Sequence, residues 1–91
     1  MAPSWDIWAC GCILFVMVTG TLPFNGFTDN EIIEAIKYYD YEYPDDIRLS
    51  YEVKDLIDLM LIKDRTKRIE IKNIYEHPWY KGEKVKKRKR T

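Results

Sequence analysis

The side chains that could ligate a metal or act as a nucleophile are few in this sequence. It contains one histidine, His77, and two cysteines, Cys10 and Cys12. One histidine far along the chain from two cysteines does not supply the ligand cluster that zinc requires. Residues two apart on a helix point to nearly opposite sides, so Cys10 and Cys12 neither bridge nor chelate. We therefore expect no metal site, and two reduced, buried thiols of the kind found in cytosolic or nuclear proteins.

A dense run of positive charge occupies residues 84–90, at the end of an otherwise acidic chain. Residues 1–80 hold 8 Lys and Arg against 14 Asp and Glu, whereas residues 81–91 hold 7 against 1. No aromatic residue interrupts the run, so we expect no base stacking by it and only non-specific attraction to nucleic acid. Two interpretations stay open, a solvated, disordered tail and a nuclear-import signal. The signal would consist of Lys86, Lys87, Arg88, Lys89 and Arg90.

Length and composition limit the chain to one small globular unit. It has 91 residues, 46% of them hydrophobic and 33% charged, as in ordinary folded domains. Its longest apolar run, residues 7–18 interrupted by Gly11, is shorter than the ~20 residues of a membrane span. The N-terminus lacks the basic region of a secretory signal and begins with Pro3 and the acidic Asp6. We expect a cytoplasmic or nuclear protein without a membrane segment.

Apolar residues at helical spacing predict four helices and no substantial strand, which is an all-α fold. The first helix covers residues 4–19, with Ser4 as its cap and Gly20 as its left-handed stop. It is apolar on every side, so we expect other protein to enclose it. Thr28 and Glu31 form a capping box for a second, amphipathic helix.

The second half of the chain continues this helical pattern. Ser50 caps a third helix with an apolar stripe, and a short fourth helix ends before Pro78. We expect Trp79 and Tyr80 to fold back onto the core. The tyrosines of residues 38–43 are expected to cover apolar surface while their hydroxyls stay in water.

The order of short motifs along this chain is more informative than any one of them. In sequence order they are Asp6-Ile7-Trp8-Ala9-Cys10-Gly11, Thr19-Gly20-Thr21-Leu22-Pro23-Phe24, Tyr43-Pro44, Lys67-Arg68-Ile69 and His77-Pro78-Trp79. The series resembles the distal half of the large lobe of a eukaryotic serine/threonine protein kinase. It is most similar to the calcium/calmodulin-dependent and AMP-activated kinase group. The resemblance covers residues 1–80 as a partial kinase domain, with residues 81–91 as a basic tail.

By this resemblance, the four helices correspond to those that the family letters F, G, H and I. Asp6 matches the aspartate that accepts hydrogen bonds from the catalytic-loop backbone. Arg68 matches the arginine that pairs with the glutamate of the Ala-Pro-Glu motif. The structural family motif as a whole comprises Asp6, Trp8, Gly11, Pro23, Phe24, Arg68, His77, Pro78 and Trp79.

The residues that perform phosphoryl transfer in that family are absent from this sequence. Transfer needs a phosphate-cradling loop, a lysine, magnesium ligands and a residue that orients the hydroxyl. The four glycines are never spaced as Gly-x-Gly-x-x-Gly, no Asp-Phe-Gly occurs, and Pro78 follows the only histidine, which excludes a His-Arg-Asp loop. We therefore expect no catalytic, cofactor-binding or metal residue here. ATP and magnesium belong to the parent family.

Two functions stay open from the sequence. The first is a fragment of a serine/threonine kinase domain that is inactive by itself and packs against the missing remainder of that domain. Met1-Ala2-Pro3 resembles the start of the Ala-Pro-Glu region, yet Asp6 follows almost at once, so the segment that separates these motifs in the family is expected to be missing. The second function is a non-catalytic helical interaction module, or pseudokinase-like remnant, that binds a protein partner through the apolar first helix.

Overall fold

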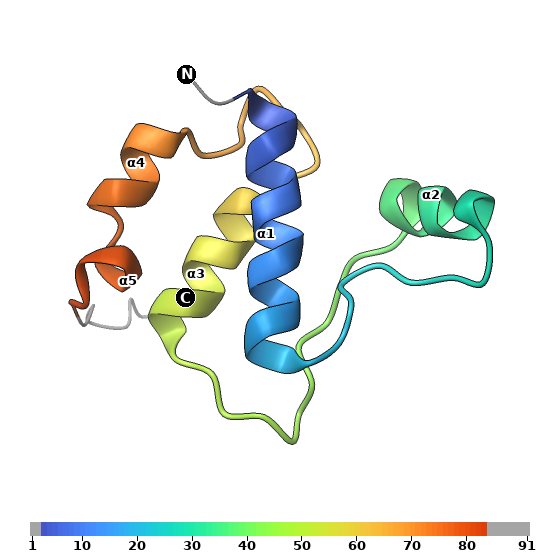
Figure 1. The fold of residues 1–91 in the computed structure, drawn as a ribbon, viewed down its shortest axis with the longest axis horizontal. Helices are drawn as coiled ribbons and strands as arrows, with labels where there is room; N and C mark the ends of the chain where they lie inside the picture. The colour runs from blue at the N-terminus through green and yellow to red at the C-terminus, as the bar shows by residue number, and fades with distance from the viewer. Residues whose placement is uncertain (1–2, 84–91) are drawn as a thin grey trace, which may run out of the picture.

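The computed structural model describes residues 3–83, and within them it contains five helices and no strand. The helices are α1 (Ser4–Thr19), α2 (Asp29–Tyr38), α3 (Tyr51–Met60), α4 (Ile71–Glu76) and α5 (Pro78–Lys81). α1 and α3 lie side by side at the centre, α4 and α5 flank α3, and α2 projects on the opposite side (Figure 1). The prediction of an all-α fold is confirmed for the described part of the chain.

α1 begins one residue away from the predicted cap. Pro3 occupies the N-cap position in an extended conformation, and Ser4 is the first helical residue. Proline fits there because a residue ahead of the first turn needs no intrahelical N–H donor. The Ser4 hydroxyl donates instead to the carbonyl of Arg65 at 3.2 Å. At the other end Gly20 adopts a left-handed conformation (φ 76°), and its N–H donates to the Val16 carbonyl, as the sequence predicts.

The core forms where one side of α1 packs against α3. Two clusters of buried residues make it up, Phe15 with Val53, Ile57 and Leu61, and Ile7 with Leu56 and Met60. Phe15 is fully buried among aliphatic side chains of α3 and the residue that follows it. Burying a side chain of this size contributes about 2 kcal/mol, so this contact is a main source of stability for the chain.

Gly11 allows the close approach of these two helices. A Cβ atom at this position would lie 2.9 Å from both the Cδ2 of Leu61 and the Cβ of Met60. No larger residue therefore fits between α1 and the end of α3 without moving one of them.

The opposite side of α1 is open within the described residues. Trp5, Ile13 and Met17 are 70%, 59% and 75% exposed and share one side of the helix. Cys10 is exposed on that side, and Cys12 is half-buried. We call Trp5, Cys10, Ile13 and Met17 the open face of α1. The expectations that other protein encloses the helix and that both thiols are buried are therefore wrong for the described residues, because α3 covers only one side of α1.

α2 is amphipathic but buries none of its residues. The Thr28 hydroxyl accepts a hydrogen bond from the Glu31 N–H at 3.2 Å, which is one half of the predicted capping box. The Glu31 carboxylate accepts from the N–H of Phe27 rather than that of Thr28, at 2.6 Å. Residues 20–28 and 39–50 connect α2 to the rest of the chain and hold it apart from the other helices (Figure 1).

α4 ends before Pro78, as predicted, but a further short helix begins at that proline. Proline is favoured in the first position of a helix, and the His77 side chain caps α5 by accepting from the Trp79 N–H at 3.1 Å. Trp79 and Tyr80 are 39% and 55% exposed, so the prediction that they fold onto the core is wrong. His77, 7% exposed, is the buried residue of this segment instead.

Candidate functional site

Arg68 ties the loop that follows α3 to the first residue of α1. Its Nη1 atom donates to the carbonyl of Ser4 at 2.9 Å and to the Ser4 hydroxyl at 3.2 Å. Its Nε atom donates to the Ile62 carbonyl at 2.9 Å, and Nη2 donates to the Lys63 carbonyl at 3.2 Å. All of these acceptors are neutral, and within residues 3–83 no carboxylate lies within ion-pair distance of the guanidinium. The position of Arg68 is thus well defined while its charge lacks a partner in that range.

The surroundings of Arg68 favour an anion. Partial burial lowers the pKa of the guanidinium from its usual value, and the nearby Asp64 acts in the opposite direction. Arginine nevertheless stays protonated at neutral pH, because its unperturbed pKa lies above 12. A half-buried cation held only by neutral acceptors gains most from a carboxylate or a similar anion placed near its remaining N–H group.

A hollow of about 660 Å³ lies beside Arg68. Its lining includes the apolar Ile7, Ile69 and Ile71 and the cations Arg65 and Arg68. Lys72 and Glu70 also line it, and they pair with each other at 3.4 Å. Ile7 is 3% exposed, so the hollow reaches the core of the chain. Such a mixture suits a peptide segment that brings apolar side chains and one acidic group.

Trp8 and Phe24 lie on the same side of the chain as Arg68. Their rings stack with centroids 5.7 Å apart and planes 14° apart. The guanidinium carbon of Arg68 is 5.0 Å from the centre of the Trp8 ring, within the range of a cation–π contact. Three residues that the sequence places in one family motif, Trp8, Phe24 and Arg68, thus form one cluster. We call it the Arg68 cluster.

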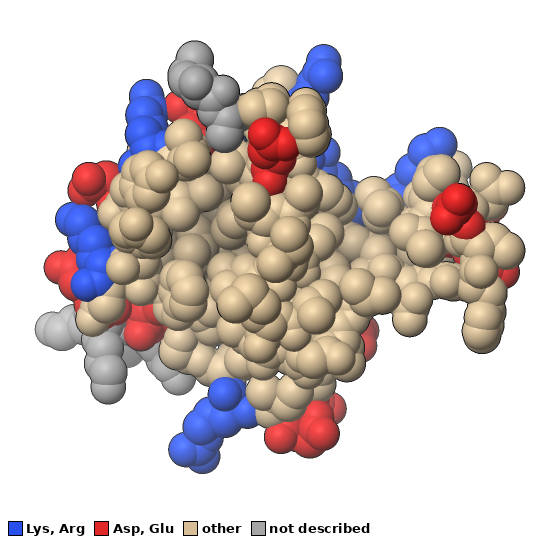
Figure 2. Space-filling view, in the orientation of Figure 1, with Lys and Arg blue, Asp and Glu red and all other residues tan. Residues whose placement is uncertain are grey.

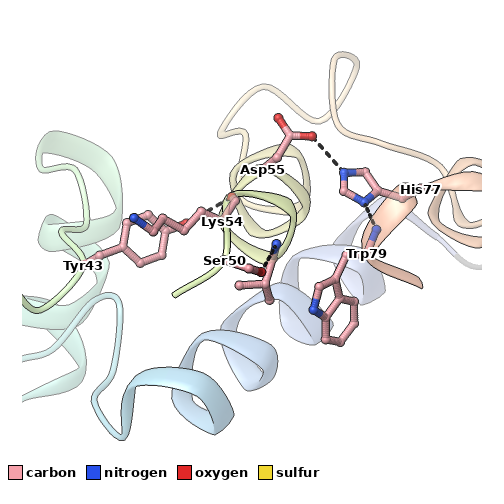
Figure 3. Close-up of polar contacts among 7 residues, drawn as sticks. Tyr43, Ser50, Lys54, Asp55, His77 and Trp79 are labelled. Carbon is pink, nitrogen blue, oxygen red and sulfur yellow. Dashed lines mark hydrogen bonds and ion pairs between the residues drawn. The ribbon is translucent and has the colours of Figure 1, made fainter. Parts of the chain in front are cut away.

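His77 forms a second, separate group with α3. Its Nε2 atom lies 2.8 Å from Oδ2 of Asp55, and its Nδ1 atom accepts from the Trp79 N–H (Figure 3). Because Nδ1 accepts, the proton of the neutral ring is on Nε2, which donates to Asp55. His77 is 7% exposed and the Asp55 side chain is 42% exposed, so the pair holds α5 against α3 at the edge of the core. Sequence analysis did not identify Asp55 as the partner of His77.

Two tyrosines and one aspartate form a further cluster that the sequence analysis did not predict. The hydroxyls of Tyr41 and Tyr43 both donate to Oδ1 of Asp58, at 2.6 and 2.7 Å. Both rings pack on Phe15, with centroids 5.6 and 5.3 Å away. Burial raises the pKa of both phenols, and the hydrogen bonds to Asp58 raise it further.

This tyrosine–aspartate cluster adds an acceptor that the sequence did not indicate. The rings of Tyr41 and Tyr43 cover the apolar Phe15, as predicted, and their hydroxyls bind the exposed carboxylate of Asp58 at the surface. The available signal was their spacing, since residues two apart in an extended segment point to the same side. Asp58 looks like an ordinary outward-facing residue of α3, so its role depends on tertiary structure.

The remaining predicted residues occupy simpler surroundings. Asp6 is half-buried in the first turn of α1, and its carboxylate accepts no hydrogen bond from residues 3–83. Pro23 is half-buried beside the buried Phe24. The import run Lys86, Lys87, Arg88, Lys89 and Arg90 lies outside the described residues. Of the predicted disordered tail, residues 81–91, the structure describes only the first three, where Lys81 ends α5 and Gly82 caps it in a left-handed conformation.

Residues 3–83 contain neither a metal-binding cluster nor a membrane-spanning helix. No group of three or more His, Cys, Asp or Glu side chains is arranged to hold a metal ion there. No helix in that range is long and apolar enough to cross a membrane.

Comparison with known proteins assigns the chain to a family. The sequence profile of the protein kinase domain matches residues 1–80. The chain belongs to the protein kinase family. The kinase chain is also similar in fold to a solved structure, the twitchin kinase region from C. elegans, with a TM-score of 0.79 and 30% identity. That match covers 87% of this chain and 14% of the twitchin chain.

Curated relatives are named as serine/threonine and SNF1-related kinases. The SNF1-related protein kinase catalytic subunit alpha KIN12 from Arabidopsis thaliana is 44% identical over 78 residues, which cover 86% of the kinase chain and 15% of that protein. The human SNF-related serine/threonine-protein kinase is 41% identical over 81 residues, which cover 89% of this chain and 10% of that protein. The kinase chain therefore spans a small part of these relatives, and it corresponds to a fragment of a protein kinase domain.

Proposed function

We propose that the kinase chain is the distal, helical part of the large lobe of a serine/threonine kinase domain. In this proposal α1, α2, α3 and α4 correspond to the family's helices F, G, H and I. The parent domain belongs to the calcium/calmodulin-dependent and AMP-activated group, which is consistent with relatives named SNF1-related and SNF-related kinases. Residues 81–91 form a basic tail outside this domain.

The Arg68 cluster is the observation that carries the proposal. In the family, the arginine that matches Arg68 pairs with the glutamate of the Ala-Pro-Glu motif. Here its guanidinium is fixed by Ser4 and the Trp8 ring, has no carboxylate partner within residues 3–83, and borders a hollow lined by apolar and cationic residues. This arrangement is the one that an acidic, partly apolar segment of the same domain would complete.

The function proposed for the kinase chain is to support the catalytic half of the domain. The parent family transfers the γ-phosphoryl group of ATP to protein serine or threonine hydroxyls. Asp6 would accept hydrogen bonds from the catalytic-loop backbone, since its carboxylate is half-buried at the start of α1. The open face of α1 would be covered by the remainder of the domain. Figure 2 shows a broad surface without Lys, Arg, Asp or Glu over the centre of this view, where α1 lies.

The described residues do not fit ATP or magnesium. A phosphate needs free N–H groups in a glycine-rich loop at the start of a helix. Gly26 precedes α2, but the Glu31 carboxylate already takes the N–H of Phe27 there and would repel a phosphate. Gly11 lies inside α1, against Met60 and Leu61, and therefore not in a loop. We therefore propose that ATP and magnesium bind in the catalytic half, and that this chain alone transfers no phosphoryl group.

A domain chimera tests the proposal. The 78 residues of KIN12 that match this chain would be replaced by the corresponding residues of the kinase chain, and phosphorylation of a peptide substrate would be measured. We expect the chimera to fold and to phosphorylate the peptide. Arg68→Ala in the chimera should reduce the activity strongly, whereas Lys67→Ala, an exposed neighbour, should leave it unchanged.

The chimera also has clear adverse outcomes. A folded chimera with no activity would contradict the equivalence of this segment to its counterpart in KIN12. Equal activities of the Arg68→Ala and Lys67→Ala chimeras would contradict the proposed role of the Arg68 cluster. Circular dichroism and thermal unfolding of each chimera separate these outcomes from a failure to fold.

The proposal also includes location and partners. The partner of the kinase chain is the rest of its own domain, and its compartment is the cytoplasm or the nucleus. The five basic residues of the import run, changed together to alanine in a fluorescent fusion, test nuclear entry. An unchanged distribution would remove the import interpretation of the tail.

A further inference from the structure

Four tyrosines in the segment between α2 and α3 fall into two classes. Tyr38 and Tyr39 are 75% and 67% exposed, and their hydroxyls form no hydrogen bond with residues 3–83. Tyr41 and Tyr43 are half-buried, with both hydroxyls bound to Asp58. Only the first two phenols are therefore free to react without a change in structure.

The segment that holds these tyrosines is acidic, although Lys63 pairs with one of its carboxylates, Asp40, at 3.6 Å. Residues 38–46 read Tyr-Tyr-Asp-Tyr-Glu-Tyr-Pro-Asp-Asp, which contains four carboxylates and no lysine or arginine. Asp40 and Glu42 lie one and three residues after Tyr39, and both are exposed. An enzyme with a basic substrate groove would be attracted to this segment by charge complementarity.

The backbone distinguishes Tyr39 from Tyr38. Tyr38 is the last residue of α2, whereas Tyr39 is extended, with φ −120° and ψ 155°. Enzymes that modify peptides bind extended segments, so Tyr38 would have to leave its helix while Tyr39 would not. Lys63 donates to the carbonyl of Tyr39 and thereby fixes its main chain, which leaves the phenol as the mobile group. α2 stands away from the other helices (Figure 1), and the side chain of Tyr39, which follows it, is 67% exposed.

We propose that Tyr39 is a phosphorylation site for a tyrosine kinase whose substrate groove is basic. The phenol oxygen of Tyr39 attacks the γ-phosphorus of magnesium-ATP held by that kinase. The bond from the γ-phosphorus to the β–γ bridging oxygen breaks, and ADP leaves with its electrons. The phenol proton passes to the catalytic carboxylate of the tyrosine kinase and then to water. Tyr41 and Tyr43 are spared while the chain is folded, because each would first have to release Asp58.

The test is site mapping on the intact chain of 91 residues. The purified chain is incubated with magnesium-ATP and a recombinant tyrosine kinase that prefers acidic peptides, and the first phosphate is located by mass spectrometry. We expect it at Tyr39, with phosphorylation at Tyr41 and Tyr43 at least about tenfold slower, the factor that loss of one hydrogen bond to a charged group implies. Tyr39→Phe should remove the first phosphate, and Tyr38→Phe, the matched control, should not.

Two further measurements separate structure from sequence preference. In a synthetic peptide of residues 35–47 no fold protects Tyr41 and Tyr43, so they should be phosphorylated as well. Asp58→Ala should also make both tyrosines acceptors in the intact chain. A first phosphate at Tyr38, Tyr41, Tyr43 or elsewhere, or none on an intact chain whose peptide is modified, would overturn the proposal. An unmodified peptide would equally overturn the inferred attraction to a basic groove.

Discussion

Gly11→Ala is a direct test of how closely α1 and α3 pack. Two effects of opposite sign act at this position. Alanine is the better helix former in a helix interior, and this effect alone would stabilise the chain by about 1 kcal/mol. The added Cβ would meet the Cβ of Met60 and the Cδ2 of Leu61 at 2.9 Å. The Met60 Cβ is bound to its own backbone and cannot turn aside, so the helices must separate, and overpacking of this kind costs about 1–3 kcal/mol.

We expect the packing cost to exceed the gain in helix propensity. The net result should be a loss of about 1 kcal/mol in the free energy of unfolding, which corresponds to a lower melting temperature by roughly 4–8 °C for a chain of this size. Urea unfolding followed by tryptophan fluorescence measures it. Ala9→Gly, on the exposed side of α1, is the matched control, and it should lose about 1 kcal/mol through helix propensity alone. If Gly11→Ala stabilises the chain by a similar amount, the close contact of α1 with α3 does not exist.

Three further predictions concern polar groups and the nucleotide. The pKa values of Tyr41 and Tyr43 are raised in the folded chain, so their contribution to stability is complete below the unfolded tyrosine pKa of about 10 and is lost as pH rises above it. The urea midpoint should therefore fall above that pH. The fall should be smaller in a Tyr41→Phe/Tyr43→Phe double variant. His77→Ala removes the hydrogen bonds to Asp55 and to the start of α5, and should lower the free energy of unfolding by about 2 kcal/mol in the same assay; an unchanged midpoint would contradict the buried pair. Calorimetric titration of the chain with magnesium-ATP should show no heat of binding, and micromolar affinity would contradict the placement of the nucleotide in the catalytic half.

The features that could be predicted from the sequence are governed by neighbouring residues. Thr28 and Ser50 cap α2 and α3 as expected, because a cap needs only a side-chain oxygen and an N–H three residues later. Gly20 ends α1 as expected, because the left-handed conformation is inexpensive for glycine alone. The short α5 was missed, since Pro78 reads equally well as the end of one helix and as the beginning of another.

The features that could not be predicted depend on contacts between distant segments. Asp55 and Asp58 look alike on the outer side of α3, yet one binds His77 and the other binds two phenols. Trp79 was predicted to pack on the core, but the smaller His77 is buried instead. Both ring nitrogens of His77 have hydrogen-bond partners, Asp55 and the Trp79 N–H. The four acceptors of Arg68 are backbone and hydroxyl oxygens, which no residue pattern specifies.

The central claim is that α1 buries one side against α3 and leaves the other side open for the rest of a kinase domain. A nuclear Overhauser spectrum of the methyl-labelled chain measures both sides at once. We predict cross-peaks from the Phe15 ring to the methyl groups of Val53, Ile57 and Leu61, and none from the Ile13 methyls to any residue of α3. Cross-peaks from Ile13 to α3, together with a Phe15 ring that shows none, would contradict the account.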